Sequence, residues 1–300
     1  MPCLPAPSWP CLRRARDHDP GARCPVQLGQ GPGAPCLGSV AWDDLQALAA
    51  WPALFVHSGH AVQVLAAPGR TLDPALDQVH RALQAQGRIR AWRDEPYPWL
   101  DAEGRRVAVI ERAASRFWGA LTFGAHCNGY LAGADGRPSH LWIAQRSLHK
   151  PTDPGLLDNL IGGGVPLGQT PRQALLREAW EEAGLQPHEL SGLQAGRVLE
   201  LHCDIPEGLQ REWLFVFDLR LPPGRVPQNQ DGEVAGFRCL PVDQALAEVR
   251  AGTLTTDAGL ATLDFAARHG LLDDASAKAL EVLQVPTDKA IRIEPTLQND

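Results

Sequence analysis

The sequence lacks the features of a membrane or secreted protein. No run of about 18 apolar residues occurs, so we predict no transmembrane helix. Arg13, Arg14 and Arg16 lie near the N-terminus, but no apolar stretch follows them, so they do not form the pattern of a secretory signal. We therefore expect a cytoplasmic protein.

Closely spaced cysteines are also missing. The seven cysteines include no CxxC pair, and their number is odd. A zinc site could be drawn on Cys3, Cys11, Cys24 and Cys36, but their wide spacing does not favour it. We favour reduced thiols, as is usual for a cytoplasmic protein.

Basic residues are fewer than acidic ones. The chain has 28 Lys and Arg against 35 Asp and Glu, a net charge of −7. This balance disfavours nucleic-acid backbones and anionic membranes as partners. It does not disfavour a phosphorylated small molecule, because a bound divalent metal can reverse the local sign of charge. We expect a small-molecule substrate, no nucleic acid and no membrane, and the oligomeric state is left open.

The pattern along the 300 residues predicts two folded units. Residues 1–36 are rich in Pro, Gly, Cys and Arg without apolar periodicity, so we expect a disordered leader or a start codon assigned too early. Residues 37–122 read as a small α+β domain. It contains strands near 60–66 and 106–112 and a helix over 72–87, between Asp73-Pro74 and Gly87.

Residues 123–285 are expected to form the second domain. Strands are predicted at 127–133, 140–147, 198–205, 211–221 and 232–240, and helices near 241–251 and 256–269. Mixed strands with flanking helices predict an α+β fold, an α/β/α sandwich with a mixed sheet. The polar residues 286–300 are expected to form a loose tail.

One segment, "GGVPLGQTPRQALLREAWEEAGL" (163–185), carries the chemistry. Thr170, Pro171 and Gln173 form a capping-box start of a helix, and Gly184 suits its end. Residues three or four apart share a helix face, so the carboxylates of Glu178, Glu181 and Glu182 should converge.

Clustered carboxylates repel one another, and Mg²⁺ or Mn²⁺ with its preference for oxygen ligands would relieve that repulsion. Arg177, four residues before Glu181, could hold that side chain in position. The glycines at 162–164 and 168 let backbone approach phosphate oxygens closely. Taken alone, the three glutamates favour a solvated acidic face on a surface helix, because charge runs are usually solvated.

The full spacing resembles the Nudix box. That pattern consists, in order, of Gly, five residues, Glu, seven residues, Arg-Glu, an apolar residue, any residue, Glu-Glu, any residue, Gly and an apolar residue. The matching positions are Gly163, Arg177, Glu178, Ala179, Glu181, Glu182, Gly184 and Leu185. Gln169 departs from the pattern by replacing its first Glu, which puts metal affinity in question rather than the fold. The resemblance implies a metal-dependent hydrolase of phosphoanhydrides. Glu178, Glu181 and Glu182 would be its metal ligands, Glu178 and Glu182 the most direct.

Further segments resemble one branch of this family. Residues 111–131, 144–168, 231–240 and 263–270 are similar to the Nudix half of fungal thiamine pyrophosphokinases and to stand-alone relatives. The resemblance spans roughly residues 85–270. It implies hydrolysis of oxidised or otherwise damaged thiamine diphosphates to the monophosphate and phosphate.

Several residues outside the box are candidates for the site. Arg146 and Lys150 could contact the diphosphate, or form surface ion pairs. Glu233 could be a metal ligand or general base on a loop, or a solvated acid in a turn. Asn128 shares a strand face with His126 and Tyr130 and could line a ring pocket. Gly163 and Gly164 complete the expected substrate-binding set.

Three other functions compete with this interpretation. Isopentenyl diphosphate isomerase has a similar "QRS…K…PG" stretch, but "LLDNLIGGG" (156–164) lacks the cysteine and histidine that its chemistry needs. A general nucleoside-diphosphate or ADP-ribose Nudix hydrolase stays open. So does a non-catalytic binding module made inert by Gln169, although all three glutamates of the helix remain.

Overall fold

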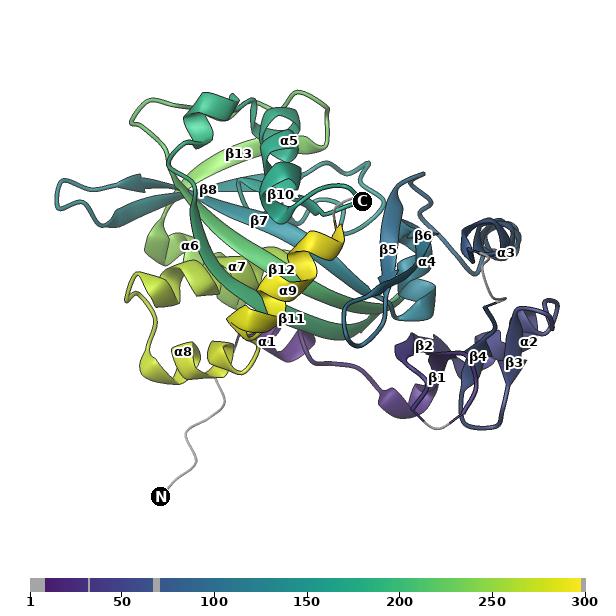
Figure 1. Cartoon of the computed structure of the whole chain (residues 1–300). Coiled ribbons are helices and arrows are strands. Elements are labelled where there is room, and N and C mark those ends of the chain that lie inside the picture. Colours follow the sequence, from purple (N-terminus) through teal and green to yellow (C-terminus); the bar gives the residue numbers. More distant parts are fainter. Residues whose placement is uncertain (1–8, 32, 67–70, 298–300) are drawn as a thin grey trace, which may run out of the picture.

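The N-terminal part of the chain folds beside a larger sandwich (Figure 1). The computed structural model describes residues 9–31, 33–66 and 71–297. The N-terminal unit is built on a four-stranded sheet of order β2-β1-β4-β3, in which only β1 and β4 run parallel. Its strands are β1 (Arg23–Leu28), β2 (Cys36–Ala41), β3 (Phe55–His57) and β4 (Val62–Val64).

A hairpin and three helices complete this unit. They are β5 (Pro96–Leu100), β6 (Arg106–Glu111), α2 (Leu45–Leu48), α3 (Asp73–Ala85) and α4 (Arg112–Trp118), with short 3₁₀ turns at Pro20–Ala22 and Trp42–Asp44. Their apolar faces share one core around Trp99 and Trp118, whose rings lie 5.2 Å apart. The indole of Trp118 donates to His80 over 2.8 Å, so this polar group is satisfied inside the core.

The larger unit is a sandwich on a seven-stranded mixed sheet. The main order is β11-β12-β7-β8-β13, with β10 paired to β7 and β9 to β8, and β7 and β12 run parallel. The strands are β7 (Leu121–Ala132), β8 (Pro138–Arg146), β9 (Leu157–Asp158), β10 (Ile161–Gly164), β11 (Gln194–Ile205), β12 (Gly208–Arg220) and β13 (Val234–Pro241).

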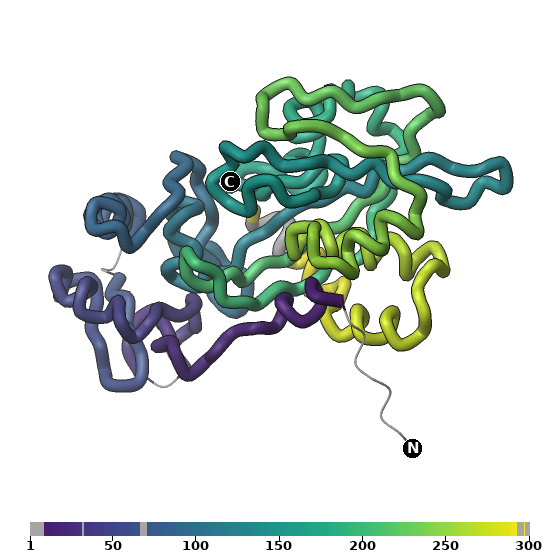
Figure 2. Tube along the Cα trace, turned by 180° about the vertical axis from the view of Figure 1, so that it is seen from behind, coloured from purple at the N-terminus to yellow at the C-terminus, as the bar shows by residue number. Residues whose placement is uncertain are grey.

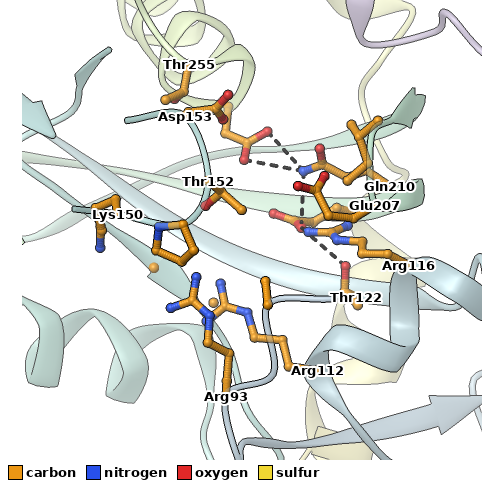
Figure 3. Close-up of a pocket in the computed structure, with 18 of the residues that line it drawn as sticks. Arg93, Arg112, Arg116, Thr122, Lys150, Thr152, Asp153, Glu207, Gln210 and Thr255 are labelled. Carbon is orange, nitrogen blue, oxygen red and sulfur yellow. Dashed lines mark hydrogen bonds and ion pairs between the residues drawn. The ribbon is translucent and has the colours of Figure 1, made fainter. Parts of the chain in front are cut away.

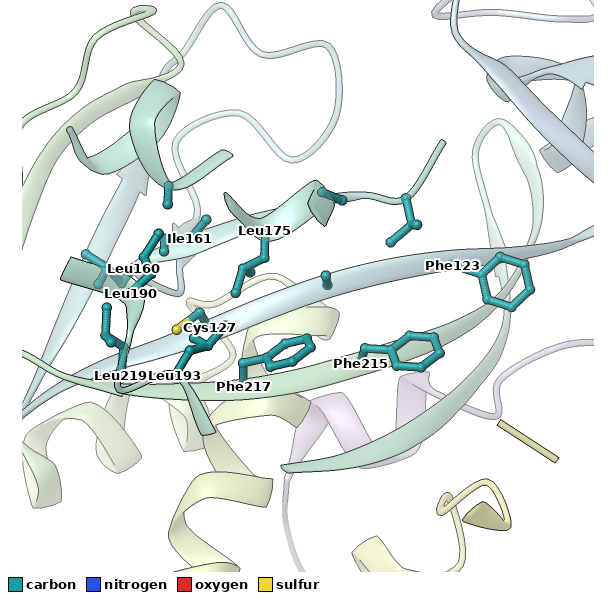
Figure 4. Packing of buried hydrophobic residues seen from close by; sticks show 14 of the residues in the cluster. Phe123, Cys127, Leu160, Ile161, Leu175, Leu190, Leu193, Phe215, Phe217 and Leu219 are labelled. Atoms are coloured by element: carbon teal, nitrogen blue, oxygen red, sulfur yellow. The ribbon is translucent and has the colours of Figure 1, made fainter. Parts of the chain in front are cut away.

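Helices cover both faces of this sheet. Helix α5 (Pro171–Ala183) packs on one face, where Leu175 meets Cys127, Phe215 and Phe217 in a core shown in Figure 4. The other face carries α1 (Pro10–Arg14), α6 (Val242–Ala251), α7 (Thr256–Arg268) and α8 (Asp274–Glu281). The 3₁₀ turn Pro187–Leu190 follows α5, and α9 (Thr287–Leu297) ends the described chain. The predicted α+β class with a small α+β unit in front is confirmed.

The expectation of a disordered leader over residues 1–36 was wrong wherever the structure describes that segment. Residues 1–8 lie outside the described residues. From residue 9, Trp9 and Ala15 are buried against the sandwich, and the Ala15 carbonyl accepts a hydrogen bond from the His202 amide over 2.8 Å. Figure 2 shows this segment running from the sandwich helices to the N-terminal sheet, where β1 already belongs to the unit expected to begin at residue 37. The contacts that dock this segment on the sandwich, such as that between Ala15 and His202, are long-range, so local periodicity did not reveal them.

The expectation of a loose tail over residues 286–300 was wrong where the structure describes that segment, because α9 continues to Leu297. Residues 298–300 lie outside the described residues. Ala290 and Leu297 are buried in the core beneath α5, and Gly168 donates to the Leu297 carbonyl over 2.6 Å. Lys289 lies over the Trp213 ring at 5.3 Å. Residues 287–289, 291 and 292 are exposed, which is why composition alone suggested a polar tail.

Candidate functional site

A cavity of about 700 Å³ opens between the N-terminal unit and the sandwich. Strand β10 and helix α5 contribute one wall, and the segment from Arg90 to Arg116 contributes another. The residues predicted for the site that line the cavity are Arg146, Lys150, Gly163, Gly164, Glu178, Glu181 and Glu233. Residues distant in sequence therefore meet in one concave, strongly polar place.

Helix α5 forms as its local signals predict. Thr170 Oγ1 accepts from the Gln173 amide and the Gln173 side chain accepts from the Thr170 amide, which makes the capping box. Gly184 ends the helix in the left-handed conformation with φ of 63°. The arrangement leaves the carboxylate-bearing side of the helix facing strand β10 and the cavity.

Arg177 holds two of the three glutamates. Its guanidinium lies 2.8 Å from Glu178 and 2.9 Å from Glu181. Glu178 is the more buried of the two, with 14% of its side chain exposed against 38% for Glu181. Burial raises the pKa of Glu178, while Arg177 opposes that shift.

Glu182 is the buried member of the set. It is 5% exposed and accepts a hydrogen bond from the Gly162 amide over 2.8 Å. Burial, followed by repulsion from Glu178 and Asp158, raises the pKa of Glu182 to about 8. A carboxylate in such surroundings is unfavourable without a cation, and Lys150 Nζ is 3.9 Å away.

The donor chemistry of this helix fits a divalent cation. Within the described ranges, no three His, Cys, Asp or Glu side chains already converge on one point suited to a metal. Glu178 and Glu181 are held by Arg177 instead. The observation that fits a hard cation is the buried, poorly neutralised Glu182 beside Glu178, because oxygen ligands of this kind are what Mg²⁺ and Mn²⁺ prefer.

The glycines of β10 allow close packing that a side chain would prevent. A Cβ on Gly163 would lie 2.4 Å from the Glu178 carboxylate, and one on Gly164 would lie 1.9 Å from the Tyr97 hydroxyl. A Cβ on Gly162 would lie 2.7 Å from the His126 ring. The chain therefore needs glycine here for proximity to functional side chains.

Gly163→Ala is expected to lower turnover about tenfold or more with little loss of stability. The three atoms nearest to the new methyl group all belong to the Glu178 side chain, which can move while the backbone stays in place. Measurement of kcat together with the thermal unfolding midpoint checks this. Wild-type turnover in the variant would mean that the position of Glu178 does not matter.

Lys150 connects the helix to the loop that carries Glu233. Its ammonium group forms an ion pair with Glu233, and Ser147 donates to the Glu233 carbonyl over 2.8 Å. Burial lowers the pKa of Lys150, with Glu182 opposing the shift. The two loops predicted to flank the substrate thus contact each other at the cavity.

The side chain of Arg146 makes its hydrogen bonds to other residues of the protein. It lies 2.8 Å from Asp158 and donates to the carbonyls of Thr152 and Asp153 over 2.9 and 3.2 Å. Its side chain is 14% exposed. The arginine lines the cavity, but its hydrogen bonds hold the 150–154 loop in place.

The prediction that Asn128 lines a ring pocket was wrong. Asn128 is 2% exposed, and its amide donates to Asp218 and to the Ala261 carbonyl, each over 3.1 Å. It also accepts from Asn159 over 3.0 Å. The alternation along β7 gave the correct face of the strand, but α7 covers that face at Asn128, so the residue joins strands to helix in the interior.

A polar wall of the cavity was not predicted from the sequence. Gln210 Nε2 lies 3.3 Å from Asp257 and 3.4 Å from Glu212, and Thr122 lies 3.2 Å from Glu212 (Figure 3). Burial, followed by Glu212, raises the pKa of Asp257 to about 7. The alternation of polar Gln210 and Glu212 within an apolar strand was the one local signal for this wall.

Basic residues of the N-terminal unit form a further part of the lining. Arg112 and Arg116 come from α4, and Arg93 from the segment before β5. Arg116 pairs with Glu212 over 3.0 Å, while its buried Nη1 atom has no partner in the described part of the protein. Nothing in the spacing of these arginines indicated that they would meet the carboxylate helix.

Part of the chain matches a known domain family. Residues 126–257 match the model of the NUDIX domain. The chain is 36% identical over 213 residues to "Nudix hydrolase 20, chloroplastic" and 38% identical over 215 residues to "Nudix hydrolase 24, chloroplastic", both from Arabidopsis thaliana. These alignments cover 70% and 69% of this chain, and the chain spans 56% and 57% of the two relatives.

A solved structure shows a weaker likeness. A crystal structure from Deinococcus radiodurans aligns with a TM-score of 0.41 at 22% identity, covering 63% of this chain and 99% of that one. Within the described residues, no helix is both long and apolar enough to cross a membrane. The two plant relatives are named as chloroplastic, and the cytoplasmic location of this chain stays a prediction.

Proposed function

Because residues 126–257 match the NUDIX domain, we propose that this protein hydrolyses a phosphoanhydride bond in a small organic diphosphate. The observation that carries the proposal is the placement of partly buried Glu178 and buried Glu182 against the glycine strand β10, beside a cavity lined by cationic side chains. Carboxylates suit a divalent metal, and cationic groups suit phosphate oxygens.

Glu178 and Glu182 would hold Mg²⁺ or Mn²⁺, with Glu181 as a more exposed third carboxylate. When bound, the metal would supply positive charge that offsets the charge developing in the transition state, and it would help to activate water. Gly163 and Gly164 keep the strand free of side chains, so the phosphate can approach its backbone.

Glu233 is the proposed general base. Its carboxylate, paired with Lys150, would take a proton from the attacking water. The water oxygen bonds to phosphorus as the bond from phosphorus to the bridging oxygen breaks. The products are a monophosphate and inorganic phosphate.

Within this class, we propose thiamine-type diphosphates, including oxidised forms, as substrates. The support is the sequence resemblance over residues 85–270 and the wall formed by Gln210, Glu212 and Asp257. Carboxylates and an amide can accept hydrogen bonds from a ring amino group such as that of an aminopyrimidine. A nucleoside diphosphate or ADP-ribose is the alternative, because the names of the plant relatives specify no substrate.

A panel measurement separates these candidates. With Mg²⁺ present, kcat/KM is measured for oxothiamine, oxythiamine and thiamine diphosphates, ADP-ribose and several nucleoside diphosphates. Preference for the thiamine compounds supports the narrower proposal, and preference for nucleotides or ADP-ribose contradicts it while keeping the reaction. The absence of turnover for every compound at saturating metal would favour a non-catalytic binding module.

Gln169→Glu is expected to preserve activity or to tighten metal binding. Gln169 stands at the first glutamate position of the box, and its buried Oε1 atom has no hydrogen-bond partner in the described protein. The substitution restores the glutamate of the Nudix-box pattern and so adds one carboxylate, the kind of oxygen ligand that Mg²⁺ prefers, to the segment that precedes α5. Titration of Mg²⁺ against turnover for both forms checks this, and a large loss of kcat would show that Gln169 has a specific role of its own.

A further inference from the structure

We infer that Arg93 and Arg112 form an anion subsite, by which the N-terminal unit binds a phosphate of the substrate. The inference rests on the proposed function and deepens it, because it gives the N-terminal unit a direct part in recognising the diphosphate. The NUDIX match begins at residue 126, so both arginines lie outside it.

Arg93 is a cation without a protein partner. Its backbone amide donates to Glu111 over 2.8 Å, but its guanidinium makes no hydrogen bond or ion pair with any residue that the structure describes. Burial, followed by repulsion from Arg112, lowers the pKa of Arg93. A half-buried guanidinium whose N–H groups have no acceptor is unfavourable unless an anion accepts their hydrogen bonds.

Arg112 faces the same space and is held in place. It pairs with Glu95 over 2.8 Å and lies 5.7 Å from the centre of the Tyr97 ring. Figure 3 shows the guanidinium groups of Arg93 and Arg112 side by side, both directed into the cavity. Glu95 is the one carboxylate paired with Arg112 within the described chain, so the two arginines keep about one uncompensated positive charge.

The subsite lies next to the carboxylate helix. A Cβ on Gly164 would be 3.1 Å from the Arg112 guanidinium, and a Cβ on the preceding Gly163 would be 2.4 Å from the Glu178 carboxylate. Successive residues of a strand point to opposite faces, so the two glycines mark different sides of β10. Both sides border the same cavity, which Arg93, Arg112 and Glu178 all line. The inference places one phosphate near Glu178 and its neighbour near the arginines.

The chemistry of the occupant follows from the donors. Guanidinium groups present planar forks that match phosphate oxygens, and two of them together favour an oxyanion with more than one oxygen to offer. The wall of Gln210, Glu212 and Asp257 offers acceptors, so it is unsuited to phosphate and suited to the organic part. The cavity thus has a phosphate end and an organic end.

The test is the binding of methylenediphosphonate, a diphosphate analogue that is not hydrolysed, by calorimetry with Mg²⁺ present. Arg93→Gln should weaken binding about 10- to 100-fold, the range for losing a hydrogen bond between charged groups. Arg93→Lys should recover part of it, since charge returns without the fork. In turnover, Arg93→Gln should raise KM more than it lowers kcat.

A matched control removes the same charge elsewhere. Arg220 is exposed at the end of β12 and is absent from the cavity lining, so Arg220→Gln should bind the diphosphonate as the wild type does. Titration of Mg²⁺ alone should be unchanged in Arg93→Gln, which separates the subsite from the metal ligands.

Unchanged diphosphonate binding in Arg93→Gln would overturn the inference, as would a wild type that does not bind the analogue at millimolar concentration. A wild type that binds through Arg93 yet hydrolyses no compound of the panel would contradict the proposed function and leave the subsite standing. The two failures are therefore distinguishable.

Discussion

Replacing Glu182 by glutamine is expected to lower kcat about 100-fold or more while the fold remains intact. The amide oxygen can still accept the hydrogen bond from Gly162, but the side chain no longer offers a charge to a metal. Metal stabilisation of the transition state contributes several kcal/mol, and each 1.36 kcal/mol is tenfold in rate.

The same substitution should not destabilise the metal-free protein. Because the pKa of Glu182 is raised to about 8 in the folded state, its ionisation opposes folding as the pH rises from about 4.5 towards 8. Glutamine cannot ionise, so the unfolding midpoint at pH 7 should be equal or higher. Glu281→Gln, at the exposed end of α8, is the control for an unrelated loss of charge. Activity within a fewfold of wild type would refute the metal assignment.

Glu178→Gln is expected to have an effect of similar size, about 100-fold, and Glu181→Gln a smaller one. Both residues pair with Arg177, but Glu178 is the more buried and lies against Gly163 on the cavity wall, whereas Glu181 is 38% exposed. A buried ligand has fewer waters that could take its place. Dependence of kcat on Mg²⁺ concentration for both variants checks the order, and a larger loss for Glu181→Gln would reverse the proposed roles.

Local signals were sufficient for the carboxylate helix. Thr170, Gln173 and Gly184 specify its ends by short-range hydrogen bonds, and the spacing of the glutamates places them on one side. Short-range rules apply to such an element because its capping partners are neighbours in sequence. The helix itself could therefore be predicted from residues 163–185 alone. The expected convergence of the three carboxylates is not seen in the described residues, because Arg177 holds Glu178 and Glu181 while Glu182 accepts a hydrogen bond from Gly162.

Local signals of this kind do not predict contacts between residues that are distant in sequence. Arg93 and Asp257 reach one cavity from distant parts of the chain, and no spacing links them. Asn128 was placed on the correct strand but assigned to the substrate, because alternation gives a face without saying which helix covers it. Trp9 and Leu297 are buried by partners far away, so composition misjudged both termini.

The most direct test of the central claim is ³¹P NMR of the protein with the diphosphate panel, first in EDTA and then after addition of excess Mg²⁺. We expect no reaction in EDTA and conversion of at least one diphosphate to monophosphate and inorganic phosphate once Mg²⁺ is added. Equal conversion without metal, or no conversion with Mg²⁺ or Mn²⁺, would contradict a metal-dependent phosphoanhydride hydrolase built on Glu178 and Glu182.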